Sequence, residues 1–166
     1  MKKSKVKSST FGKSLILAGV IFAIVAITLF LCPFIKTSAY DVDGFKAIFG
    51  YKEVASLTIA GVTTSTTIYE IKITALFLIG FILIALSVLL GLFGFIGKGI
   101  VGKIVLAVAA LLLIVAGVFM FVGKYNFAST NGYDDASKVT TQIGAILCGS
   151  YSFASALSFA GAALIK

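Results

Sequence analysis

The chain has 166 residues, of which 60% are hydrophobic and 12% are charged. Soluble domains carry about 25% charged residues, so this composition excludes a water-soluble globule and makes lipid the expected solvent of most of the chain. The sequence has no His, Trp or Arg, and its six carboxylates and two cysteines leave few candidates for a catalytic base, nucleophile or metal ligand. We therefore expect a protein that is not an enzyme and has neither a cofactor nor a metal site.

Residues 1–13 form a basic segment with five lysines and no carboxylate. Such a segment stays on the cytoplasmic side during membrane insertion, and each lysine near an anionic lipid surface adds about 1 kcal/mol. Membrane lipids are the expected partner, and nucleic acid is not. The apolar run that follows, residues 14–31, has 18 residues, which exceeds the ~7–15 residues of the apolar region of a cleaved signal peptide, so we expect it to be retained.

Four uncharged apolar stretches occupy residues 14–32, 73–96, 104–123 and 140–165. A bilayer core about 30 Å thick needs about 20 helical residues, and isolated helices satisfy their own backbone hydrogen bonds inside lipid. The sequence thus predicts an all-α membrane protein, a bundle of four transmembrane helices. Residues 97–103 form a tight glycine-rich cytoplasmic turn between the second and third spans.

Lysine placement predicts the orientation of the bundle. With the N-terminus inside, Lys98, Lys103 and Lys166 are inside too, whereas the six remaining lysines balance the six carboxylates outside. The whole net charge of +8 is then cytoplasmic. We expect a multi-pass plasma-membrane protein with both termini in the cytoplasm, and the use of Lys without Arg favours an AT-rich bacterial genome.

Residues 33–72 form the first extracellular segment, in which the β-prone stretch from Glu53 to Ile71 predicts a small hairpin. With Ala60-Gly61 as its turn, one face of the hairpin would hold six side chains: Ala55, Leu57, Ile59, Val62, Thr64 and Thr66.

Asp41-x-Asp43-Gly44 is similar to the start of a calcium loop. A third acidic ligand and a Glu at the twelfth position do not follow, so we interpret the motif as an Asp-Gly turn.

The second extracellular segment, residues 124–139, is short enough to cap the helix ends and contains an Asn131-Gly132 turn. Five of the six Tyr lie in the two outer segments, where their rings suit the lipid headgroup level. The alternative is a surface that binds a protein partner, built from Phe45, Phe49, Tyr51 and Tyr133.

Small residues recur along one face of each span, and close helix packing in lipid depends on such residues. The predicted packing positions are Gly19, Ala23, Ala26, Gly80, Ser87, Gly91, Gly94, Ala109, Ala116, Gly149, Ser150, Ala154 and Ser158.

The fourth span has almost no bulky face, so we expect it to be the most enclosed helix. Its serines should bond their own helix at i−4 or reach a neighbour; an oligomer contact and a polar path are the alternatives. Cys32 and Cys148 lie at different depths, so no disulfide is expected.

Four helices, internal termini and a large first outer loop with strands resemble claudin-like tetraspan proteins in outline. That family's loop signature of Trp and paired Cys does not occur here, so no residue or role is carried over. The function we expect is that of a non-enzymatic accessory component, which engages a protein partner or copies of itself through its outer loops and small-residue helix faces. A subunit of an oligomeric channel or transporter is the alternative.

Overall fold

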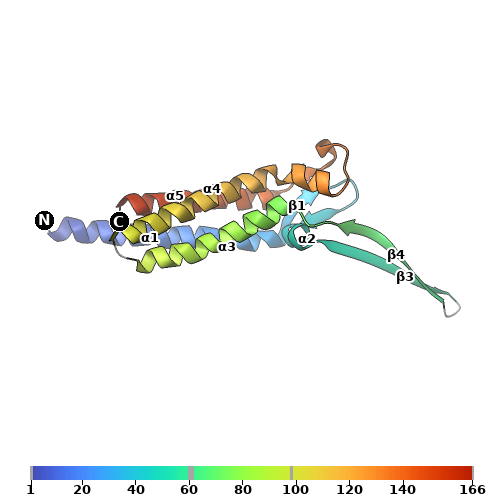
Figure 1. The fold of residues 1–166 in the computed structure, drawn as a ribbon, viewed down its shortest axis with the longest axis horizontal. Helices are drawn as coiled ribbons and strands as arrows, with labels where there is room; N and C mark the ends of the chain where they lie inside the picture. Colours follow the sequence, from blue (N-terminus) through green and yellow to red (C-terminus); the bar gives the residue numbers. More distant parts are fainter. Residues whose placement is uncertain (1, 60–61, 98, 166) are drawn as a thin grey trace.

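The structure, a computed structural model, describes residues 2–59, 62–97 and 99–165. Four long helices lie side by side in one elongated bundle (Figure 1). They are α1 (Lys2–Thr28), α3 (Ala75–Ile96), α4 (Gly99–Thr130) and α5 (Ile143–Ile165). Each is long and apolar enough to cross a membrane, which confirms the helical part of the predicted fold.

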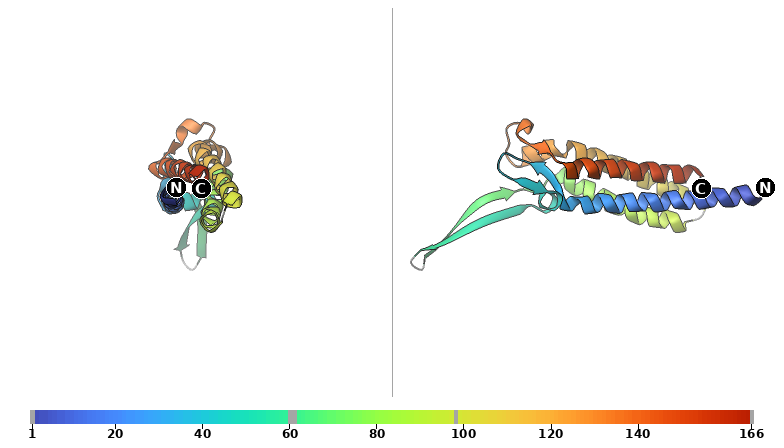
Figure 2. Two further views of the ribbon diagram at one scale, coloured as in Figure 1. Left: turned by 90° about the vertical axis from the view of Figure 1, so that its left-hand side faces the viewer. Right: turned by 180° about the vertical axis from the view of Figure 1, so that it is seen from behind.

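The helices form a ring in which α1 packs on α3 and α5, and α4 packs on the same two helices. The end-on view in Figure 2 shows this arrangement. Both chain termini and the α3–α4 connection lie at one end, which we call the terminal end, and all strands lie at the other, the strand end (Figure 1).

Two helices extend well beyond their predicted bounds. Helix α1 begins at Lys2, within the predicted basic segment of residues 1–13. Helix α4 begins at Gly99, within the predicted turn of residues 97–103, and continues to Thr130. Residues 124–130 are therefore helical, and the predicted loop of residues 124–139 is wrong in its first half. Phe127 and Ala128 are buried there, so core packing keeps this polar stretch helical. Asn131-Gly132 does form a turn, with Gly132 at φ 76°.

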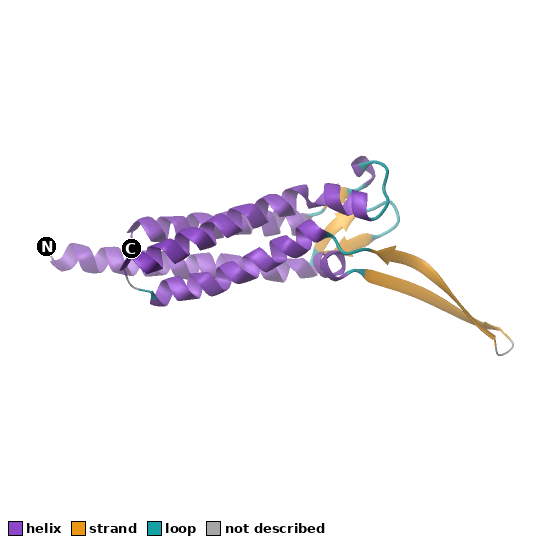
Figure 3. Ribbon diagram, in the orientation of Figure 1, coloured by secondary structure: helices purple, strands orange, loops and turns teal. Residues whose placement is uncertain are grey.

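The predicted hairpin is present as β3 (Tyr51–Ile59) and β4 (Val62–Ile71). The strands are antiparallel and pair Ile59 with Val62, Leu57 with Thr64 and Ala55 with Thr66, so the predicted register is confirmed. Its expected turn, residues 60–61, falls outside the described residues. Figure 3 shows the hairpin extending well beyond the bundle.

A second, smaller sheet was not predicted. Its strands β1 (Pro33–Lys36), β2 (Asp41–Asp43) and β5 (Thr140–Thr141) have the order β2-β1-β5. Short helical turns accompany it: α2 (Gly44–Phe49), η1 (Leu29–Leu31) and η2 (Ala136–Lys138). The sheet joins the segments that precede α2 and α5, so it closes the strand end of the bundle.

The Asp43-Gly44 pair begins a helix and is not the turn that its sequence suggested. Asp43 Oδ1 accepts a hydrogen bond from Lys46 N at 2.8 Å, as an N-cap. Its other oxygen lies 3.5 Å from Lys46 Nζ. Capping therefore occupies the carboxylate that had resembled a calcium ligand.

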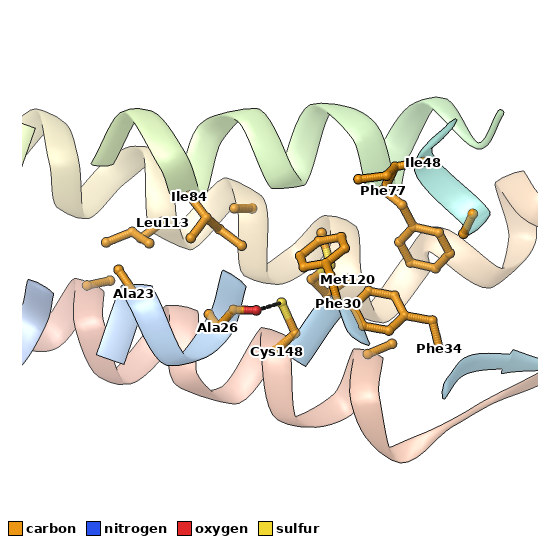
Figure 4. Close-up of a cluster of buried hydrophobic side chains, with 14 of the residues drawn as sticks. Ala23, Ala26, Phe30, Phe34, Ile48, Phe77, Ile84, Leu113, Met120 and Cys148 are labelled. Carbon is orange, nitrogen blue, oxygen red and sulfur yellow. Dashed lines mark hydrogen bonds between the residues drawn. The ribbon is translucent and has the colours of Figure 1, made fainter. Parts of the chain in front are cut away.

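The core runs along the bundle axis and is richest in aromatic rings near the strand end (Figure 4). Phe30 lies 4.6 Å from Phe34, and Phe34 lies edge-on to Phe77 at 5.4 Å between ring centroids. Cys148 Sγ donates to the carbonyl of Ala26 at 3.3 Å. Both cysteines are free, as expected.

Glycines on the helix faces receive large side chains from neighbouring helices. Phe159 of α5 lies between Gly19 and Gly91, where an added Cβ would come within 2.6 Å and 2.5 Å of its ring. Phe77 fits in the same way against Gly123. The small residues thus form holes for bulky knobs.

Ten of the predicted packing positions are buried: Gly19, Ala23, Ala26, Gly80, Ser87, Gly91, Gly94, Ala109, Ala116 and Gly149. Ala154 and Ser158 are partly buried, and Ser150 is exposed. The assignment of Ser150 to a packed face is wrong, because its hydroxyl bonds Ile146 O of its own helix at 2.9 Å and the side chain lies on the outer face.

Helix α5 is the most enclosed of the four, as predicted: 44% of its 18-residue apolar stretch is buried, against 28% to 39% in the other three helices. Ser150, Ser152 and Ser158 bond carbonyls four residues earlier. Ser155 instead reaches Gly19 O of α1 at 2.7 Å. Its serines therefore follow both bonding patterns expected from the sequence.

Candidate interaction surface

The base of the β3–β4 hairpin is fixed by backbone geometry at Gly50. This residue has φ 75° and ψ 160°, a region that only glycine adopts readily. A Cβ there would lie 3.0 Å from Ile71 O of the opposite strand. Glycine at this position therefore lets the chain leave α2 and enter β3 directly beside the end of β4.

Two asparagines of the α4 end hold the exit from β4. Asn131 Oδ1 accepts from Lys72 N at 2.8 Å, and Asn126 Oδ1 accepts from Leu76 N at 3.1 Å. On the other side, Thr74 N donates to Ala47 O at 2.8 Å. These bonds join the hairpin to α4 and α2. The sequence signalled Asn131 only as a turn residue and gave no signal for Asn126.

A chain of tyrosine rings links the hairpin to the small sheet and to α4. Tyr69 stacks on Tyr40 with centroids 4.5 Å apart and contacts Tyr51 at 5.7 Å. Tyr40 and Tyr133 approach to 3.4 Å between their hydroxyl oxygens. Burial, followed by the hydrogen bond with Tyr133, raises the pKa of Tyr40. A hydrogen bond with Glu53 is the main cause that raises the pKa of Tyr69 to about 12.

The structure brings together three of the four residues predicted as a partner surface. Phe45 and Phe49 stack at 6.0 Å, and Lys46 Nζ lies 4.8 Å above the ring of Tyr51. Phe49 is 63% exposed. Tyr133 lies apart from them, stacked on Phe127 and partly buried, and it connects to Tyr51 only through the other tyrosines.

An open groove of about 500 Å³ runs along the base of the hairpin. Its walls carry an exposed aromatic pair, Phe49 and Tyr51, with Lys52, Glu70 and Lys72 beside them. Aromatic residues are enriched at the core of protein–protein interfaces, and the rim around such a core is polar. This groove can therefore accept an apolar anchor flanked by ionic contacts.

Beyond its base, the hairpin projects away from the bundle (Figure 1). Among residues 2–59, 62–97 and 99–165, β3 and β4 pair only with each other. Val54 and Ile68 are 50% and 60% exposed, and the described Ser and Thr side chains of both strands are exposed as well. Both faces and both edges of the ribbon are thus open.

No group of three metal-ligating side chains occurs within the described ranges. A second groove, of about 540 Å³, lies between α4 and α5 toward the terminal end, where Ala107, Ala110, Ala160 and Ala163 leave room and Lys103 lies at its margin. Apart from Lys103, its lining residues are apolar.

No model of a known protein family matches the chain, and comparison with the curated proteins finds no similar sequence.

Proposed function

We propose that this chain is a non-enzymatic integral membrane protein whose four helices anchor a projecting β-hairpin that binds a protein partner. The hairpin carries this proposal. A two-stranded ribbon has little stability alone in water, and an uncovered edge is a template for further strands. A ribbon with strands of nine and ten residues, held at its base by hydrogen bonds and exposed elsewhere, is suited to contact another macromolecule.

The charge distribution supports an orientation in which the hairpin lies outside the cell and both termini lie in the cytoplasm. Lys13 and Lys103 lie toward the terminal end, and Lys13 Nζ is 5.9 Å from the ring of Phe95 on α3. All six carboxylates belong to the strand end. The rule that lysines remain inside then directs the hairpin outward, and the plasma membrane of a bacterium is the location we propose.

Site-specific photocrosslinking in native membranes tests the function. A photoreactive residue at Thr67, exposed on β4, should give a discrete protein adduct. The matched control is a photoreactive residue at Leu157, which is 75% exposed on α5 and should react with lipid alone. Absence of any protein adduct from Thr67 and from Val54 on β3 would overturn the proposal.

Flux measurements separate this function from the alternative, a subunit of an oligomeric channel or transporter. The purified chain in vesicles should pass no ions, because the buried hydroxyls within the long helices, those of Ser87, Ser152 and Ser155, each donate to a backbone carbonyl. Sustained ion flux that depends on protein concentration would favour the channel.

A further inference from the structure

The exposed strand β4 has a symmetrical sequence. Residues 62–68 are Val-Thr-Thr-Ser-Thr-Thr-Ile, which has the same succession in both directions apart from the interchange of Val and Ile at its ends. Ser65 lies at the centre. The described side chains of this stretch, from Thr63 to Ile68, are all exposed.

This symmetry makes β4 complementary to itself. In an antiparallel pair related by a two-fold axis at Ser65, each residue faces the one equally far from the centre on the other copy. Thr64 then faces Thr66, Thr63 faces Thr67, and Val62 faces Ile68. Cross-strand Thr pairs and pairs of β-branched apolar residues are favourable, so every opposed pair in the stretch is a compatible one.

Charge also favours β4 over β3 as the pairing edge. The one charged residue of β4 is Glu70, which lies outside the symmetrical stretch and meets no like charge in this register. The β3 strand carries Lys52 and Glu53 within its first three residues and has no comparable symmetry. In an antiparallel ladder every second residue of β4 directs its N–H and C=O away from β3, so this edge has the backbone groups that pairing needs.

We infer that β4 pairs with β4 of a second copy of this chain, across a two-fold axis at Ser65, to form a four-stranded sheet of order β3-β4-β4-β3. The inference rests on the proposed function and names the partner of the hairpin. The second copy supplies the additional strands that a lone two-stranded ribbon lacks.

The geometry of the hairpin places the two copies in facing membranes. The hairpin leaves the strand end at a shallow angle to the bundle axis and points away from it (Figure 1). Antiparallel pairing reverses the direction of the second hairpin, so the two bundles lie at opposite ends of the shared sheet. Two copies side by side in one membrane would present their β4 strands in nearly parallel orientation.

Cysteine crosslinking tests the register. In a chain with Cys32 and Cys148 replaced by Ser, Ser65→Cys should give a covalent dimer with a short thiol crosslinker when two vesicle populations with differently tagged protein are mixed. Ser56 faces Ser65 within the hairpin, and in the dimer the two Ser56 residues lie three strand spacings apart, about 14 Å. Ser56→Cys is therefore the matched control and should give at least tenfold less dimer.

A charge substitution gives the second measurement. Ser65→Lys opposes two cations on the axis and should reduce vesicle clustering at least tenfold, whereas Ser56→Lys should leave it unchanged; both side chains are exposed, so both variants should fold. Dimers confined to a single vesicle population, or equal effects of the two substitutions, would overturn the inference. Photoadducts with a different protein and no β4 dimer would overturn self-pairing while the proposed function stands; no protein adduct of any kind would end both.

Discussion

At the scale of single residues, the glycines of the bundle divide into those that receive a side chain and those that do not. Gly91 meets the ring of Phe159, whereas the nearest atom to an added Cβ on Gly161 is Leu15 Cδ1 at 3.5 Å, an ordinary contact. Both lie inside helices. The same substitution should therefore have opposite effects at the two sites.

We expect Gly91→Ala to lower the free energy of unfolding by about 1–3 kcal/mol, because the added methyl overpacks the core against Phe159. Gly161→Ala should raise it by up to about 1 kcal/mol, since Ala is the better helix former. Thermal unfolding of the purified variants in one detergent gives the comparison. Equal destabilisation by both substitutions would contradict the knob-and-hole assignment.

Asp135 is the residue outside the helices whose carboxylate is most clearly stabilised by its neighbours. Hydrogen bonds from the hydroxyl and backbone N–H of Ser137, at 2.6 Å and 2.8 Å, lower the pKa of Asp135. Its contribution to stability is therefore complete above the ordinary pKa of Asp and is lost as the pH falls through the lowered value of the folded state.

Ser137→Ala should raise the pKa of Asp135 toward its ordinary value, because the hydroxyl hydrogen bond is the largest cause of the shift. A pH titration of the Asp135 carboxyl carbon by NMR in micelles measures this change. Ser129→Ala, on the exposed last turn of α4, is the control and should leave the titration where it was.

At the scale of elements, the hairpin depends on the junction that joins it to the bundle. The ribbon itself buries little, so its order comes from Gly50, from Asn126 of α4, from Asn131 in the turn after α4 and from the tyrosine contacts at its base. A defect at this junction should loosen β3 and β4 and leave the four helices intact.

Gly50→Ala should have this local effect, since the backbone conformation at Gly50 costs a residue with a Cβ about 1–3 kcal/mol. We expect faster amide hydrogen exchange throughout β3 and β4, with unchanged protection in α3 and α5. Ser56→Ala, at an exposed position of β3, serves as the control. Loss of protection in the helices as well would show that hairpin and bundle form one cooperative unit.

The sequence predicts those helices and strands whose formation depends on residues close together in the chain. The four helices follow from uncharged apolar length, and the hairpin register follows from a two-residue turn that places Ile59 opposite Val62. The small sheet could not be predicted, because β5 has two residues and pairs with a strand about one hundred residues earlier in the chain. Such short strands exist only through tertiary contacts.

The candidate site shows the same limit. Phe49 and Tyr51 could be predicted as surface residues because they are aromatic residues of an outer segment. The position of Tyr133 could not be predicted, because it depends on where α4 ends. Asn126 lies within a helix, where a polar side chain usually faces solvent. In the structure the junction between β4 and α3 lies beside Asn126, and Asn126 Oδ1 accepts a hydrogen bond from Leu76 N.

At the scale of the whole molecule, the bundle separates a basic end from an end of mixed charge. Every acidic residue lies between Asp41 and Asp135, in the segments that join the helices at the strand end. The terminal end carries lysines alone. Under the rule that lysines remain inside, this separation predicts that the strand end is the end that crosses the membrane.

A membrane-impermeant thiol reagent applied to intact cells tests the orientation. In the background without Cys32 and Cys148, Thr66→Cys on the hairpin should label fully, and Thr10→Cys on α1 should label only after the membrane is opened. Both positions are exposed in the fold, so a difference in labelling between them shows on which side of the membrane each lies and does not reflect burial. Labelling of Thr10→Cys in intact cells would reverse the proposed topology. It would also place the hairpin in the cytoplasm, where two copies could not meet across facing cell surfaces.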